Sequence, residues 1–194
     1  MIDIIKYARE VMDIEVAGIL RVKDSLGEDF IAMVDACVAA LNKGGKLVIT
    51  GVGKSGYIGK KMAATLSSVG SPSIFMHPVE ALHGDLGIMQ KDDLLIALSY
   101  SGETDELLTT LVPAKRLGIP LVSITGSKNS RLAKLSDVTV EMAVEREACP
   151  FNLAPTTTTT ALLAVGDALA MVLLNVRGFS KQDYGRLHPG EIGR

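Results

Sequence analysis

The feature of this sequence that most constrains its fold is an alternation of short, uninterrupted apolar runs with longer helical stretches. The runs occupy residues 46–51, 73–76, 93–99, 120–126 and 137–140. A strand that is apolar at every position is buried on both faces, as in parallel sheets that have helices on each side. The pattern therefore predicts an α/β fold in which a parallel sheet lies between layers of helices.

Helical periodicity marks both ends of the chain. Apolar residues recur at spacings of three, four and seven over residues 2–26, and a second such pattern fills 30–41. A final helix is expected from about Pro155 to Val176, with Gly178 just after its end. Because no linker or repeat is evident, residues 1–194 are expected to form a single domain. The helices within 1–43 are expected to pack on the sheet or in a subunit interface.

Charge and aromatic content exclude a class of partner. The 194 residues carry 20 Lys and Arg against 22 Asp and Glu, a formal net charge of −2, and only 4% are aromatic. Such a chain lacks the basic surface and the stacking side chains that nucleic-acid binders use. We therefore expect no nucleic-acid partner.

The sequence also predicts a cytoplasmic protein without a membrane partner. An acidic residue occurs by position 3, and no apolar run near it has the length of a signal peptide. The longest uncharged stretch, 151–166, is too short and too polar to span a membrane. Cys37 and Cys149 form no metal-ligand pattern, and they fit a reducing compartment in which a buried thiol acts as a small apolar side chain.

Four polar segments follow the predicted strands and are expected to meet at one edge of the sheet. They occupy residues 51–56, 77–85, 99–106 and 125–128. In open parallel sheets, ligands bind beyond the carboxyl ends of the strands. Most of the side chains capable of chemistry should therefore gather at this edge.

The first of these segments, GVGKSG at 51–56, places glycines at the spacing G-x-G-x-x-G. A dinucleotide site is disfavoured because no acidic residue ends the next strand, which runs into His77. The phosphate-loop motif of NTPases fails because Val48 stands where its first glycine would be. Two interpretations stay equally open: a helix N-terminus that holds an anion beside Lys54, or a tight turn with an exposed lysine.

Three hydroxyls surround Gly102 where the third predicted strand passes into a helix: Ser99, Ser101 and Thr104. Hydroxyls and helix N–H donors together can bind a phosphate without arginine. An ordinary N-cap by Ser101 is the alternative, but capping explains one hydroxyl rather than three. The cluster therefore favours an anion site. Glu106 follows at once, where an acid is also expected from the helix dipole.

The three histidines lie outside any core pattern. His77 and His83 share one predicted loop, and His188 lies in a predicted polar tail at 184–190. Histidine titrates near neutral pH, so these side chains are candidates for proton transfer; solvated loop residues are the alternative. A metal site has little support, because no Cys or second carboxylate shows a known ligand spacing.

Together these segments resemble the sugar isomerase (SIS) domain of D-arabinose 5-phosphate isomerases, from about residue 5 to the end of the chain. The motifs that carry the resemblance are GVGKSG, HPVEALHGDLG, SYSGETDE, EACP, LAPTTTTT, GDALA and HPG, which begin at residues 51, 77, 99, 147, 153, 166 and 188. The family implies a three-layer αβα fold of the flavodoxin or Rossmann type with a five-stranded parallel sheet. Many relatives continue into a pair of CBS domains after this point, so a form lacking CBS domains is expected. The tail also departs from the family, because it reads HPGEIGR where relatives usually have HPGG and one more residue before the final Gly-Arg.

The resemblance also implies roles for individual residues. Phosphate binding falls on Ser55, Ser99, Ser101 and Thr104, catalysis on Lys54, Glu106, Glu147 and His188, and substrate contact on His77 and His83. His77 is also a position where zinc can bind, although no cofactor is required. Members form tetramers in which a neighbouring subunit completes the site, so a homo-oligomer, expected to be a tetramer, is implied.

The implied reaction interconverts D-arabinose 5-phosphate and D-ribulose 5-phosphate through a cis-enediol and feeds Kdo synthesis for lipopolysaccharide or capsule. Moving a proton between C2 and C1 needs a base and a group that polarises the carbonyl. We interpret Glu106 or His188 as the proton shuttle, with Glu106 preferred, and Lys54 as the charge that stabilises the enediolate. His83 would orient substrate hydroxyls, and Glu147 would hold a partner in register.

Two other functions stay open. An SIS isomerase acting on a hexulose or heptose phosphate would share these motifs, although the HGD and HPG segments argue against it. A non-catalytic sugar-phosphate sensor would carry an N-terminal helix-turn-helix. Residues 1–43 are more acidic than basic, which is the wrong sign for gripping DNA phosphates.

Overall fold

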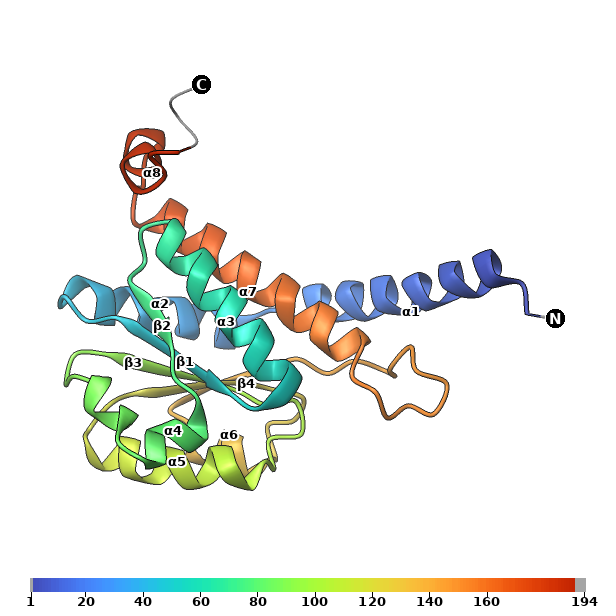
Figure 1. Ribbon diagram of the computed structural model, residues 1–194, viewed down its shortest axis with the longest axis horizontal. Helices are drawn as coiled ribbons and strands as arrows, with labels where there is room; N and C mark the ends of the chain where they lie inside the picture. Colours follow the sequence, from blue (N-terminus) through green and yellow to red (C-terminus); the bar gives the residue numbers. More distant parts are fainter. Residues whose placement is uncertain (1, 191–194) are drawn as a thin grey trace.

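The computed structural model describes residues 2–190 and contains a five-stranded sheet (Figure 1). The strands are β1 (Leu47–Gly51), β2 (Ser73–Phe75), β3 (Leu94–Leu98), β4 (Leu121–Thr125) and β5 (Val138–Glu141). Their order is β2-β1-β3-β4-β5, and every neighbouring pair is parallel. The predicted five-stranded parallel sheet is confirmed, with the strand order of flavodoxin-like folds.

The three central strands are buried at every residue, whereas β2 and β5 at the edges are mostly half-buried. Ile49 pairs with Ile96 and faces one core, while Val48 pairs with Leu95 and faces the other. Successive side chains of a strand point to opposite faces. An apolar run without polar interruptions therefore supplies side chains to both cores. This double burial is the physical reason for the continuous apolar runs in the sequence.

Helices form a layer on each face of the sheet (Figure 1). One core is shared with α2 (Glu28–Asn42), α3 (Gly53–Ser68) and α7 (Thr157–Val176), and the other with α4 (Pro78–Leu82), α5 (Asp105–Arg116) and α6 (Arg131–Leu135). Cys37 lies in the first core, where burial raises the pKa of its thiol to about 12. It therefore acts as a small apolar side chain, and both cysteines are free.

Helix α1 (Ile4–Ser25) packs against α7 with its C-terminal half, where Gly18 and Val22 are buried. Its N-terminal half extends away from the sheet (Figure 1). Apolar side chains on this projecting part are largely exposed: Ile4 73%, Ile5 60% and Met12 65%. Of the two predicted N-terminal helices, α2 covers the sheet, whereas much of the apolar stripe of α1 is uncovered in a single chain.

The structure differs from the sequence-based expectation in its short helices. The predicted loop after β2 contains α4 and a 3-10 turn (Asp85–Ile88), and α6 was not expected. Residues 184–187 of the predicted polar tail belong to α8 (Lys181–Leu187), which a capping box between Ser180 and Asp183 stabilises. Helices of one or two turns show too little periodicity to be found from sequence. The departure expected in the tail, at 191–194, lies outside the described residues.

Within residues 2–190, α7 is the one helix that is long and apolar enough to cross a membrane by length and composition. The core helix of a soluble protein passes the same test, and α7 packs against α1, α2 and α3. These contacts bury 39% of its apolar window, so they account for part of its apolar composition.

Candidate active site

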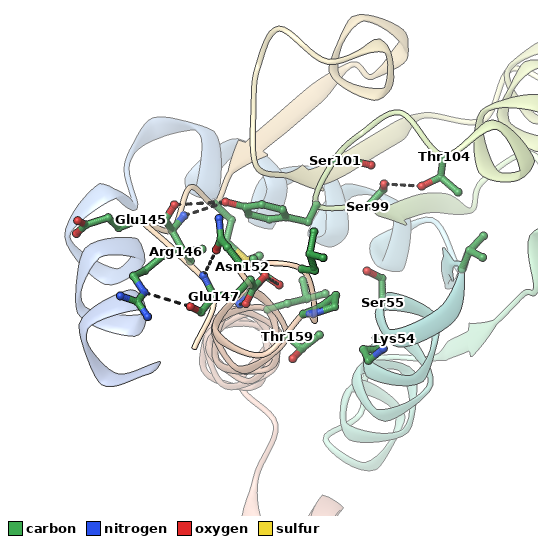
Figure 2. A pocket seen from close by; sticks show the side chains of 18 residues that line it. Lys54, Ser55, Ser99, Ser101, Thr104, Glu145, Arg146, Glu147, Asn152 and Thr159 are labelled. Carbon is green, nitrogen blue, oxygen red and sulfur yellow. Dashed lines mark hydrogen bonds between the residues drawn. The ribbon is translucent and has the colours of Figure 1, made fainter. Parts of the chain in front are cut away.

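A pocket of about 440 Å³ lies at the carboxyl edge of the sheet. Its walls come from the first turn of α3, the loop that joins β3 to α5, the segment after β5, and the first turns of α7 (Figure 2). Six of the residues expected at the site line it: Lys54, Ser55, Ser99, Ser101, Thr104 and Glu147. The predicted segments 51–56 after β1 and 99–106 after β3 thus meet in this pocket, whereas the predicted segments 77–85 and 125–128 contribute no residue to its lining. The segment after β5, which was not among those predicted, forms a wall of the pocket.

The first wall is the N-terminus of α3. Val52 occupies the N-cap position, and no side chain caps this end of the helix. A Cβ on Gly56 would lie 2.7 Å from the carbonyl oxygen of Gly51, so a glycine is needed for α3 to start this close to β1. Uncapped N–H groups beside Ser55 and the exposed Lys54 form an anion-binding arrangement. This favours the anion site over the simple turn.

The second wall is the hydroxyl cluster that follows β3. Ser99 Oγ lies 3.1 Å from Thr104 Oγ1 and accepts a hydrogen bond of 3.1 Å from the Gly102 backbone N–H. Ser101 Oγ accepts one of 3.2 Å from the Glu103 N–H. The N-cap of α5 is Thr104, whose side chain makes no capping bond, so an ordinary N-cap by Ser101 is wrong. The hydroxyls instead shape a loop around the open end of α5.

The backbone of this loop requires a glycine at position 102. Its φ is +66°, and a Cβ there would lie 2.8 Å from Thr125 Oγ1 and closer still to Ser130. Gly102→Ala is expected to lower the free energy of unfolding by about 2–4 kcal/mol, because left-handed backbone strain and steric overlap add. Urea denaturation measures this. Gly118→Ala is the control: its φ is +74° with nothing within 4 Å, so about 1 kcal/mol is expected. Equal losses in both variants would contradict this account.

The third wall contains Glu147, which is buried between β5 and α7. Thr156 donates to Glu147 Oε2 through its backbone N–H at 2.8 Å and its hydroxyl at 3.2 Å. Thr158 donates to Oε2 through its N–H at 3.2 Å and to Oε1 through its hydroxyl at 2.5 Å. Burial by itself raises the pKa of Glu147, but these hydrogen bonds outweigh it and hold the pKa below the usual range.

Three other expected residues lie around α4 and outside the pocket lining. His77 is half-buried and caps α4, since its Nδ1 accepts from the Val79 N–H at 3.3 Å, and His83 is exposed at the end of that helix. Glu106 is exposed in the first turn of α5. One turn further, Thr110 donates to the Pro78 carbonyl at 2.9 Å, so Glu106 is on the side of α5 that faces α4.

His188 is at the opposite end of the molecule from the pocket. It follows α8, with its ring stacked on Tyr184 at 3.8 Å between centroids and its Nδ1 3.0 Å from the Tyr184 carbonyl oxygen. The pocket is at the N-terminus of α7 and α8 follows its C-terminus, a separation of about 30 Å for a helix of 20 residues (Figure 1). A single chain does not bring His188 to Lys54.

The zinc that the resemblance allows at His77 finds no ligand set among the described residues. Among residues 2–190, no group of three or more His, Cys, Asp or Glu side chains is arranged to hold a metal ion. The Nδ1 of His77 is already occupied by the Val79 N–H. The described residues do not fit a metal at this position, and no step of the chemistry is assigned to one.

Sequence reasoning missed several residues that shape the pocket. The Tyr100 hydroxyl lies 3.3 Å from the Val144 nitrogen, from which it accepts, and 3.4 Å from the Val144 oxygen, to which it donates. Asn152 and Thr158 bond the backbone and the side chain of Glu147 respectively. The run of threonines at 156–160, which capping does not explain, was the signal for Thr158.

A pocket lined by hydroxyls at the carboxyl edge of a flavodoxin-like sheet, with two uncapped helix N-termini, defines an α/β protein whose site is suited to an anion. The chain belongs to the SIS domain family, which it matches over residues 40–172. It is similar to the arabinose 5-phosphate isomerase KdsD of Pseudomonas aeruginosa, with 48% identity over 194 residues. A probable arabinose 5-phosphate isomerase of Haemophilus influenzae is 44% identical over 191 residues.

The alignments cover 100% and 98% of this chain but 59% and 56% of those two relatives. Among solved structures, an Escherichia coli CFT073 protein in complex with arabinose 5-phosphate has a TM-score of 0.92 and 42% identity, covering 96% of this chain and 98% of that one. A Bacteroides fragilis protein described as a phosphosugar isomerase involved in capsule formation has a TM-score of 0.93 and 36% identity, with the same coverage.

Proposed function

We propose that this protein is an aldose–ketose isomerase that interconverts D-arabinose 5-phosphate and D-ribulose 5-phosphate. One observation carries the proposal: the chain is 42% identical, over nearly its whole length, to a protein that was solved in complex with arabinose 5-phosphate. The pocket supports it, because hydroxyls and open helix N-termini suit a phosphate while Lys54 supplies one positive charge beside it.

In this proposal the substrate phosphate binds Ser55, Ser99, Ser101 and Thr104. The sugar carbons then extend from this end of the pocket toward the catalytic groups. Glu106 is the preferred base that moves the proton between C2 and C1, with His188 as the alternative, and His77 and His83 contact the substrate hydroxyls. Lys54 stabilises the negative charge of the cis-enediolate.

The reaction moves a proton within one molecule and transfers no electrons to another, so it needs no cofactor in principle. The D-arabinose 5-phosphate it forms would supply Kdo synthesis, for lipopolysaccharide or capsule. We place the enzyme in the cytoplasm, without a nucleic-acid or membrane partner, on the basis of its composition and two free cysteines.

The test is a coupled isomerase assay on a panel of pentose, hexose and heptose phosphates. D-arabinose 5-phosphate is expected to turn over with the highest kcat/KM, and D-ribulose 5-phosphate is expected to form. Faster turnover of a hexulose or heptose phosphate would replace this substrate assignment. Binding without turnover of any sugar phosphate would favour the non-catalytic sensor.

We propose further that the protein is a homo-oligomer, in keeping with the tetramers that the resemblance implies. The exposed apolar residues on the projecting half of α1 and the distance of His188 from the pocket support this. Size-exclusion chromatography with light scattering is expected to give about four times the mass of one chain. Replacing Ile5 and Met12 with lysine together should lower that mass, whereas a wild-type monomer would contradict the proposal.

A further inference from the structure

The run of threonines at the start of α7 divides by hydrogen-bond partner. Thr159 and Thr160 donate to the carbonyl of Thr156, as hydroxyls near a helix end often do, and Thr160 also reaches Glu15 on α1. Thr156 and Thr158 instead direct their hydroxyls and backbone N–H groups at the carboxylate of Glu147. Thr156 and Thr158 thus hold a carboxylate from another segment, which the first residues of an ordinary helix are not required to do.

The carboxylate of Glu147 takes the place of a helix cap. Thr156 occupies the N-cap position of α7, but its side chain makes no capping bond. The N–H groups of Thr156 and Thr158 are satisfied by Glu147, which comes from nine residues earlier in the chain. A negative charge at a helix N-terminus is also favoured by the helix dipole. The hydrogen bonds between the N-terminus of α7 and the Glu147 carboxylate are therefore strong, and they fix the direction in which the carboxylate points.

Two further hydrogen bonds hold the loop at residues 148–156. The Ala148 N–H donates to Thr156 Oγ1 at 2.9 Å, and the Glu147 N–H donates to Asn152 Oδ1 at 2.7 Å. Asn152 has a φ of +54°, a left-handed conformation that asparagine tolerates. Asn152, Leu153 and Pro155 of this loop line the pocket, so the Glu147 contacts fix one of its walls (Figure 2).

This wall is also joined to the phosphate end of the pocket. The hydroxyl of Tyr100, which follows Ser99 directly, contacts both the nitrogen and the oxygen of Val144. The chain from Val144 to Glu147 thus lies between two anchors, Tyr100 at one end and Thr158 at the other. A shift of Glu147 would move the wall relative to a bound phosphate.

We propose that Thr158 and Thr156 are positioning residues: they hold Glu147 as a fixed carboxylate that keeps the 148–156 loop in place as the wall facing the sugar. Glu147 on this account transfers no proton. The inference rests on the proposed isomerase function, which supplies the substrate that the wall positions.

The chemistry of the contact agrees with this role. A proton-transfer group works best when its pKa lies near the working pH. Burial raises the pKa of Glu147, but the hydroxyl and N–H donors outweigh burial and lower it below the ordinary range. The charged residues that line the pocket with Glu147 are the exposed Glu145 and Arg146 on its own segment and the exposed Lys54 on α3. Glu15 on α1 contacts Thr160 rather than Glu147. Glu147 thus stays ionised at neutral pH.

The kinetic test uses three threonine variants. Thr158→Val keeps the shape of the side chain and removes the hydroxyl. It is expected to lower kcat/KM for D-arabinose 5-phosphate about 10- to 100-fold, because a wall displaced by about an ångström misplaces the reacting carbons. Thr158→Ser should recover activity to within about threefold. Thr160→Val, in the same run but without contact to Glu147, should match the wild type.

Inhibition by inorganic phosphate distinguishes a misplaced wall from general damage to the pocket. It competes for the phosphate end of the pocket, so its inhibition constant is expected to change less than about twofold in Thr158→Val. Parallel loss of phosphate binding and turnover would overturn the proposal. So would a Thr158→Val enzyme that behaves as Thr160→Val does.

Two pH measurements complete the test. Titration of the Glu147 carboxyl carbon by NMR is expected to show a pKa below that of ordinary Glu in the wild type, raised in Thr158→Val and restored in Thr158→Ser. The acid limb of kcat/KM should keep its position in Thr158→Val and in Glu147→Gln. A limb that moves with either variant would show that Glu147 is itself the proton-transfer group, against the proposal.

These outcomes also separate this inference from the proposed function. A wild-type protein that converts no D-arabinose 5-phosphate would contradict the isomerase, and the NMR titration would still report whether Thr158 controls Glu147. An active isomerase whose Glu147 titrates in the ordinary range would contradict the positioning role alone.

Discussion

Replacing Glu106 with glutamine is expected to lower kcat about 10²- to 10⁴-fold, the range that general-base catalysis contributes. The amide keeps the size of the side chain but cannot accept the C2 proton. The carboxylate is exposed in the first turn of α5, beside the hydroxyl cluster and on the side that faces α4. A small change in KM is expected, because proton removal belongs to the chemical step rather than to binding.

The measurement is exchange of the C2 proton with solvent deuterium, which reports proton removal directly. Exchange should slow by the same factor as kcat. Glu103→Gln is the matched control, since Glu103 follows the same hydroxyls but accepts a hydrogen bond of 2.9 Å from the Arg131 N–H. It should retain most activity. Near-normal exchange in Glu106→Gln would remove Glu106 as the base and leave His188, from another copy of the chain, as the candidate.

The second large effect is expected from Lys54→Ala, a loss of about 10²- to 10³-fold in kcat. This is the usual effect of removing one group that stabilises a developing negative charge. Lys54 lines the pocket at the open N-terminus of α3, where the helix dipole adds to its charge (Figure 2). The enediolate carries more negative charge than the bound sugar. Lys54→Ala should therefore remove more stabilisation from the transition state than from the bound substrate.

Steady-state kinetics distinguish this role from simple phosphate binding. A lysine that stabilises the enediolate affects kcat, whereas a lysine that only binds the phosphate affects KM. Lys60→Ala is the control, because Lys60 lies on the same helix but over the rings of Tyr57 and Phe75, at 5.6 and 5.5 Å from their centroids. Unchanged kcat in Lys54→Ala would contradict the charge-stabilising role.

Much of this site was accessible from the sequence because it depends on segments that are continuous in the chain. Ser99, Ser101 and Thr104 lie within six residues, and a parallel strand places its end at the ligand edge whatever the rest of the fold does. Lys54 and Ser55 follow β1 for the same reason. The short helices α4 and α8 were missed, so the loop of His77 and the tail of His188 were expected to be irregular.

The sequence by itself determined the layers of the fold and which segments reach the edge of the sheet. Burial on both faces requires continuous apolar runs, and these are readable without coordinates. Only the tertiary structure decided that Glu147 meets Thr158, and that His188 ends a helix, α8, which follows the C-terminus of α7. Such contacts depend on how a loop closes and how long a helix runs between two sites. Those distances are set by packing in three dimensions rather than by local pattern.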